Sequence, residues 1–248
     1  MRTANPALSA KSFTGVGRAV DTARAMTING TVNKTALLAV LTLIPATYTW
    51  RMYYTAWDPS AVVPWIIGGA IGGFIVALIT IFKKQWAAYT APVYALLEGL
   101  FLGGFSAMFE AKYPGIVIQA VTLTFGTLFC LLFVYRSGLI KVTQNFRLGV
   151  VAATGGIALI YVATILLGLF GVRMPFIHES GTIGIAFSLF VVIIAALNLV
   201  LDFDFIENGA AYGAPKYMEW YGAFALMVTL IWLYIEILRL LAKLRGRR

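Results

Sequence analysis

The chain has 248 residues, of which 60% are hydrophobic and only 12% charged, and its mean hydropathy is +0.87. Roughly a quarter of the residues of a soluble domain are charged, so this composition excludes an ordinary soluble protein and predicts one integral membrane domain. The net charge is +9, but the basic residues form short clusters between apolar stretches and at both ends, where anionic lipid headgroups attract them. This distribution disfavours a nucleic-acid-binding protein.

Residues 1–34 form a polar lead-in with five Lys/Arg and one acid. They lack the continuous apolar core of a cleavable signal peptide, so we expect a basic cytoplasmic tail. Seven apolar segments follow, each long enough to cross a bilayer as a helix. These segments cover residues 35–55, 61–82, 86–109, 114–135, 148–171, 181–206 and 217–241. The predicted organisation is an all-α membrane domain of seven transmembrane helices over 35–242, followed by a basic tail over 243–248.

The distribution of Lys and Arg between the loops predicts a cytoplasmic N-terminus in the cell (inner) membrane. In that orientation eleven Lys/Arg lie on the inner side and three on the outer side before the C-terminus, as the positive-inside rule requires. The terminal AKLRGRR contradicts this excess of basic residues on the inner side. Seven spans that start from a cytoplasmic N-terminus would place it on the outer side. Either all seven segments span or one of them re-enters. The length of the last segment favours seven spans, and the side of the C-terminus stays open.

Small residues recur every four positions in the second and third apolar segments. This spacing lets helix backbones approach closely, which is how helices associate inside a bilayer. The residues concerned are Gly68 with Gly72, Gly69 with Gly73, and Ala95, Gly99 and Gly103. The pattern predicts a tight bundle and carries no information about chemistry.

Acidic residues inside apolar segments are functional candidates, because a charge at membrane depth is energetically costly. Glu98 lies near the middle of the third segment, where it is either a hydrogen-bonded structural group or part of a proton or cation path. Asp202 lies four residues after Asn198, so the two share a helix face, whereas Asp204 is rotated by about 200° from Asp202. We therefore expect Asp202 to be functional and Asp204 to be solvated at headgroup level with Glu207.

Two further acids have a basic neighbour one helical turn away. Glu236 precedes Arg239 by three residues, which predicts an ion pair near the membrane surface. Glu219 follows Lys216 by three residues, which predicts the start of the last span. The ENG run at 207–209 predicts the polar end of the sixth span, with its glycine as a left-handed cap.

Known catalytic motifs such as G-x-S-x-G, Walker A and H-E-x-x-H do not occur in the sequence. The single histidine, His178, and the single cysteine, Cys130, exclude the usual Cys/His zinc sites and an intramolecular disulfide. We therefore expect no enzyme, no cofactor and no stable metal site.

The C-terminal run AALNLVLDFDFIENGAAYGAPKYMEWYGAFALMVTLIWLYIEILRLL, together with YALLEGLFLGGFS and the seven-span layout, resembles a bacterial member of the Bax inhibitor-1 family, also called the transmembrane Bax inhibitor motif family. The resemblance covers roughly residues 61–242. It implies a fold in which the last helix is central and the other six wrap it. It also implies a pH-sensitive calcium leak, controlled by one acid on the sixth helix and one on the seventh that share a proton in the closed state.

By this resemblance, Asp202 matches the first acid of the family pair. The second position is either Glu236, if LYIE is matched, or Thr229, if ILRLL is matched. The helix rise places Thr229 nearer than Glu236 to the level of Asp202, which favours Thr229. In that case the carboxylate pair is absent and the steep response of two coupled groups is lost.

We therefore expect a pH-sensitive cation leak channel with Ca²⁺ as the permeant ion and the lipid bilayer, cations and protons as its partners. The predicted ion pathway and gate consist of Asp202, Glu98, Glu236, Thr229, Asp204 and Asn198. The alternative is a non-transporting scaffold or stress-response modulator that binds other membrane proteins, such as a quality-control protease. In that case the acids are structural, and the outward faces or the basic tails matter.

Overall fold

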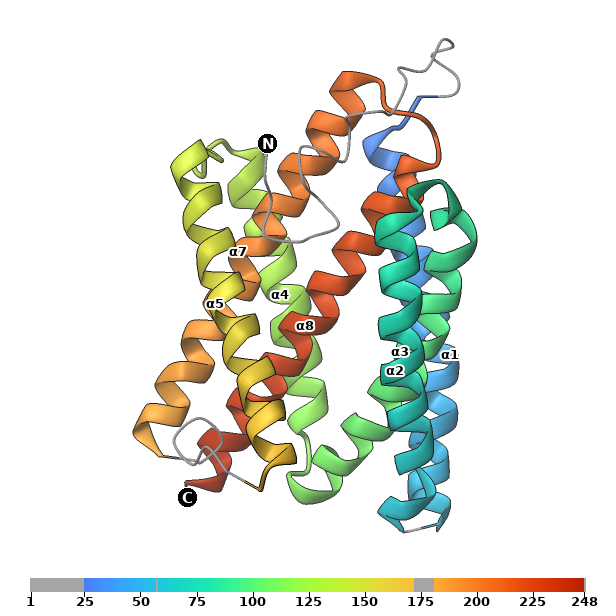
Figure 1. The fold of residues 1–248 in the computed structure, drawn as a ribbon, viewed down its shortest axis with the longest axis vertical. Coiled ribbons are helices and arrows are strands. Elements are labelled where there is room, and N and C mark those ends of the chain that lie inside the picture. Colours follow the sequence, from blue (N-terminus) through green and yellow to red (C-terminus); the bar gives the residue numbers. More distant parts are fainter. Residues whose placement is uncertain (1–24, 57, 172–180, 248) are drawn as a thin grey trace. The chain divides into compact units, whose positions relative to one another are not determined.

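The computed structural model describes residues 25–56, 58–171 and 181–247, which form an all-α protein. Within these ranges the backbone forms seven long helices and two short 3₁₀ turns, η4 (Pro59–Ala61) and η5 (Lys84–Trp86) (Figure 1). The helices are α1 (Ile28–Ala56), α2 (Val63–Phe82), α3 (Ala87–Lys112), α4 (Ile116–Arg136), α5 (Gln144–Leu169), α7 (Thr182–Tyr212) and α8 (Met218–Gly246). Each coincides with one of the seven predicted segments, which confirms the helix prediction.

Six of these helices, α2 to α8, are long and apolar enough to cross a membrane. The remaining helix, α1, has 29 residues but carries several threonines and Arg51, which lower its hydropathy. It also begins seven residues before the predicted segment 35–55, because Thr27 caps it: the Thr27 hydroxyl accepts the N–H of Gly30 at 3.0 Å. Most of the predicted tail, and His178, lie outside the described residues.

The described helices form two compact units. Unit 1 contains α4 and α5, α7 up to Phe203, and α8 from Thr229 onward. Unit 2 contains α1, α2 and α3, α7 from Asp204, and α8 up to Val228. The chain thus passes from one unit to the other inside α7 and inside α8.

In unit 2, helix α3 packs against both α1 and α2, and the three run side by side (Figure 1). Gly103 faces α1 so closely that a Cβ there would overlap the carbonyl oxygen of Ala46, and a Cβ on Gly99 would overlap that of Thr42. On the α2 side, a Cβ on Gly69 would lie 2.6 Å from the Leu97 carbonyl oxygen. The predicted close packing through small residues is therefore confirmed for these helices.

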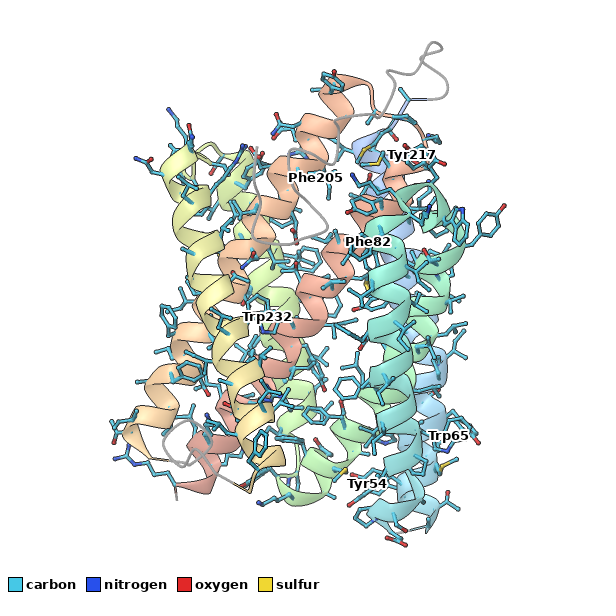
Figure 2. The ribbon with its side chains drawn as sticks, viewed as in Figure 1. Tyr54, Trp65, Phe82, Phe205, Tyr217 and Trp232 are labelled. Carbon is cyan, nitrogen blue, oxygen red and sulfur yellow. The ribbon has the colours of Figure 1, made fainter. Side chains whose placement is uncertain are left out.

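Unit 1 packs through side chains instead. Ile157 of α5 and Val191 and Ile194 of α7 form a buried cluster, against which Trp232 of α8 packs (Figure 2). The glycines of α4 and α5 have no atom within 4 Å of a Cβ position among the described residues; they are Gly126, Gly149, Gly155, Gly156 and Gly168. Helix contacts in this unit thus depend on interlocking side chains rather than on backbone approach.

Candidate functional site

The six predicted site residues are divided between the two units. Unit 1 holds Asn198 and Asp202 of α7 with Thr229 and Glu236 of α8. Unit 2 holds Glu98 of α3 and Asp204 of α7.

Asp202 is completely buried, with 0% of its surface exposed, on the α7 face that also carries Asn198. The Asn198 amide donates hydrogen bonds to the Thr154 hydroxyl of α5 (2.9 Å) and to the carbonyl oxygen of Ile194 (2.8 Å). An amide and a carboxyl group thus lie one turn apart on a buried stripe of α7. Burial of a carboxylate in an apolar helix is costly, which makes Asp202 the first functional candidate.

Glu236 is also buried, with 1% of its surface exposed. Its Oε1 accepts hydrogen bonds from the Tyr161 hydroxyl of α5 (2.9 Å) and from Nη1 of Arg239 (3.1 Å). The predicted Arg239 partner is confirmed, and the carboxylate itself is buried inside unit 1. Only Arg239 reaches the surface, with its side chain 43% exposed, because Tyr161 from another helix covers the carboxylate.

Thr229 is buried as well, and it lies seven residues before Glu236 on α8. Seven residues are close to two helical turns, so the two side chains share one face of α8, about 10 Å apart along its axis. Leu233 lies between them and is fully buried. Both candidates for the second family position therefore belong to the same buried stripe.

In unit 2, Glu98 is half-buried and hydrogen-bonded to the side chain of Tyr94 one turn earlier. A Cβ on Gly73 would lie 2.7 Å from Oε1 of Glu98, so the backbone of α2 packs directly on the carboxylate. Tyr94 in turn stacks edge-on against Phe224 of α8, with ring centroids 5.0 Å apart. Glu98 thus contacts α2 and its own helix α3, and its partner Tyr94 contacts α8, all within unit 2.

The end of the sixth span differs from the prediction. Helix α7 continues to Tyr212, and the left-handed residue that follows it is Gly213 with φ = 71°, not Gly209. The Asn208 amide donates to the carbonyl oxygen of Asp204 at 2.6 Å, one turn earlier in the same helix. Asp204 lies inside α7 and is half-buried.

Glu219 is the residue whose environment sequence reasoning missed. It is fully buried and accepts hydrogen bonds from the backbone N–H (2.9 Å) and hydroxyl (2.8 Å) of Thr27. It also forms ion pairs with Lys34 and, at 2.8 Å, with Lys216. A Cβ on Gly30 would overlap this carboxylate, so a larger residue there requires the Glu219 side chain to shift. Sequence spacing revealed Lys216 alone, because Thr27 lies 192 residues away.

An open groove of about 330 Å³ on α4 contains none of the predicted site residues; it is lined by Ile118, Gln119, Thr122 and Leu123. Across residues 25–56, 58–171 and 181–247, no group of three or more His, Cys, Asp or Glu side chains could hold a metal ion. The candidate site residues of unit 1 lie instead on the buried faces of α7 and α8.

Comparison with known proteins assigns the chain at the level of a family. A family profile described as Bax inhibitor 1 like matches residues 5–246, nearly the whole chain. No curated protein and no solved structure matches it.

Proposed function

Because the chain belongs to the Bax inhibitor 1 like family, we propose that it is a pH-sensitive leak channel for cations, in particular Ca²⁺, with Asp202 as its gate. The observation that supports this proposal is the complete burial of Asp202 in a helix apolar enough to span a membrane. A buried carboxyl group attracts a cation only in its charged form, and its protonation depends on pH. Cation passage would then follow the protonation of Asp202.

In this proposal the other groups of the ion path are Asn198 and either Glu236 or Thr229 in unit 1, and Glu98 and Asp204 in unit 2. Ca²⁺ prefers hard oxygen ligands, and two or three carboxylates without a full ligand cage bind it weakly and transiently. Such binding suits a permeant ion rather than a resident one. No cofactor and no enzymatic step is part of the proposal.

We also propose that the N-terminus is cytoplasmic in the cell membrane and that α8 is the central helix of the fold. Over half (56%) of the most apolar window of α8 is buried, a larger share than in the other five apolar helices. The excess of Lys and Arg in the loops assigned to the inner side supports the orientation.

Flux measurements in proteoliposomes test the channel proposal. In the wild type we expect a Ca²⁺ flux whose rate changes between about pH 5 and pH 8. In Asp202→Asn we expect the rate to be independent of pH. Glu207→Gln is the matched control, because Glu207 is an exposed acid on the same helix. Absence of flux in the wild type, or an unchanged pH profile in Asp202→Asn, would contradict the proposal.

The second candidate function is a scaffold or stress-response modulator that transports nothing and binds other membrane proteins, such as a quality-control protease. Glu219 supports it, because this fully buried acid is hydrogen-bonded by Thr27 and ion-paired with two lysines. Such contacts stabilise the fold, as this function expects of the buried acids. This function predicts no flux, and it predicts capture of membrane proteins that is lost when residues 1–24, which precede α1 and its cap Thr27, are removed. A channel does not need this tail for flux.

A further inference from the structure

A layer of apolar side chains lies between α5, α7 and α8 inside unit 1. It consists of Ile157 of α5, Val191 and Ile194 of α7, and Trp232 of α8, which packs against the other three (Figure 2). Ile157, Val191 and Ile194 are buried. We call these four residues the apolar layer. None of their side chains contains an oxygen atom, so the layer offers no side-chain ligand to Ca²⁺.

Polar groups lie on one side of the apolar layer. The Asn198 amide donates to the Thr154 hydroxyl at 2.9 Å and to the carbonyl oxygen of Ile194, which is itself a residue of the layer. Asp202 lies one turn further along the same face of α7. The titrating group of the proposed channel is therefore on this side of the layer.

Polar groups also lie on the other side of the apolar layer. The ring of Tyr161 packs against the layer, and its hydroxyl donates to Oε1 of Glu236 at 2.9 Å. Arg239 contacts the same oxygen and has 43% of its side chain exposed. Lys243 donates to Oγ of Ser188 at 2.7 Å. Polar and charged side chains thus continue from the layer to the surface of unit 1.

The order polar, apolar, polar recurs on all three helices. Spacings of three and four residues place each set on one face of its helix. The sets are Thr154, Ile157 and Tyr161 on α5, Thr229, Trp232 and Glu236 on α8, and, in the antiparallel helix α7, Asn198, Ile194 with Val191, and Ser188. On α5 and α8 the two polar positions are seven residues apart, which is about 10 Å along the helix axis.

We infer that the apolar layer is the barrier that closes the ion path between the Asp202 side and the Glu236 side of unit 1. This inference rests on the proposed channel function and assigns the position at which the ion is stopped. Water leaves a narrow apolar segment, so such a constriction blocks ions without a charged gate. The path conducts only when the side chains of the layer separate enough to admit water.

Substitutions that change polarity and size separately test the barrier in proteoliposomes with the full-length protein. Val191→Thr keeps the shape of the side chain and adds a hydroxyl group, so Ca²⁺ flux should rise several-fold at the pH where the wild type conducts least. Val191→Ile adds a methyl group, so flux should fall several-fold at the pH where the wild type conducts most. A purely structural residue would change the flux in the same direction in both variants. The thermal midpoint shows that each variant is folded.

Val200→Thr is the matched control, because Val200 is a fully buried valine nine residues further along α7, about 180° around the helix from Val191. An equal rise in this control would overturn the barrier. Unchanged flux in Val191→Thr, beside a pH-dependent wild type, would also overturn it and leave the channel in place.

A wild type without flux contradicts the channel proposal and still leaves the barrier open to test. Flux that appears only in Val191→Thr would then support the barrier. Ile157→Thr introduces a hydroxyl group into the layer from α5 and makes the same test if Val191→Thr does not fold. Absence of flux from the wild type and from both threonine variants would overturn the barrier as well.

Discussion

The two units bury their acids in different surroundings. In unit 2, Glu219 is fixed by Thr27 and two lysines, and the helices around it approach through glycines. In unit 1, Glu236 contacts one tyrosine and one partly exposed arginine, and the glycines of α4 and α5 meet open space among the described residues. Unit 2 is therefore held by close backbone contacts and by an acid paired with two lysines. We expect the helices of unit 1 to change their side-chain contacts more readily, and any response to pH to originate there.

Removal of the Glu219 carboxylate should give the largest loss of stability. Glu219→Ala removes the hydrogen bonds from Thr27 and the shared partner of Lys34 and Lys216, and the loss of hydrogen bonds to a charged group costs about 1.5–3 kcal/mol. The free energy of unfolding can be measured by SDS titration in mixed micelles. The exposed Glu207→Ala serves as control and should change stability by less than about 0.5 kcal/mol. Equal losses in both variants would contradict the special role of the Glu219 contacts in holding unit 2 together.

A methyl group on the α1-facing side of α3 should have the next largest effect. Gly103→Ala places a Cβ against the Ala46 carbonyl, and overpacking costs about 1–3 kcal/mol. Gly156→Ala in α5 is the matched variant. It meets open space among the described residues and removes a poor helix former, so a gain of up to about 1 kcal/mol is expected. The same sign in both variants, in the same SDS titration, would show that the units do not differ in packing.

The polar contact between α5 and α7 should contribute less. Asn198→Ala and Thr154→Val each break the 2.9 Å hydrogen bond, and a double-mutant cycle should give a coupling energy of about 0.6 kcal/mol, as in other membrane helix pairs. A coupling above about 1.7 kcal/mol would indicate that unit 1 is as firmly held as unit 2. The pH dependence of Ca²⁺ flux in the Asn198→Ala variant shows whether this hydrogen bond also influences Asp202, which lies on the same face of α7.

Loss of one hydroxyl group should have the smallest effect on stability. Tyr161→Phe removes a single hydrogen bond to Glu236, which Arg239 continues to contact, so the expected cost is about 0.5 kcal/mol. Tyr234→Phe on α8 is the control for a tyrosine hydroxyl elsewhere in unit 1. A cost of Tyr161→Phe as large as that of Glu219→Ala would contradict the picture of a loosely held acid.

The seven helices could be predicted from the sequence, because long apolar segments leave few alternatives in a bilayer. Their ends could not be predicted as well. Thr27 caps α1 and also bonds a distant acid, so α1 begins before the apolar segment, and α7 continues past Gly209 to Tyr212. Hydropathy is insensitive to such local hydrogen bonds and to polar residues at a helix end.

The candidate site could be predicted only in part. Local spacing revealed Arg239 as the partner of Glu236 and the shared face of Asn198 and Asp202. It did not reveal that Tyr161 covers Glu236, because that contact joins residues 75 apart. In the same way, GGAIGGF contains two equivalent glycine pairs. Only the structure shows that Gly69 faces α3 while Gly68 meets open space among the described residues.

The hydrogen bonds from Thr27 to Glu219 join the beginning of the first described helix to the beginning of the last one. During synthesis, α1 leaves the ribosome long before α8 exists, so the N-terminal turn of α1 lacks this carboxylate until α8 has been made. Met26 and Ala25 likewise lack their backbone partners at Ala214 and Pro215 until then. A chain that ends before α8 would expose Lys34 and an incompletely capped helix end. This contact therefore distinguishes a chain that contains α8 from one that does not.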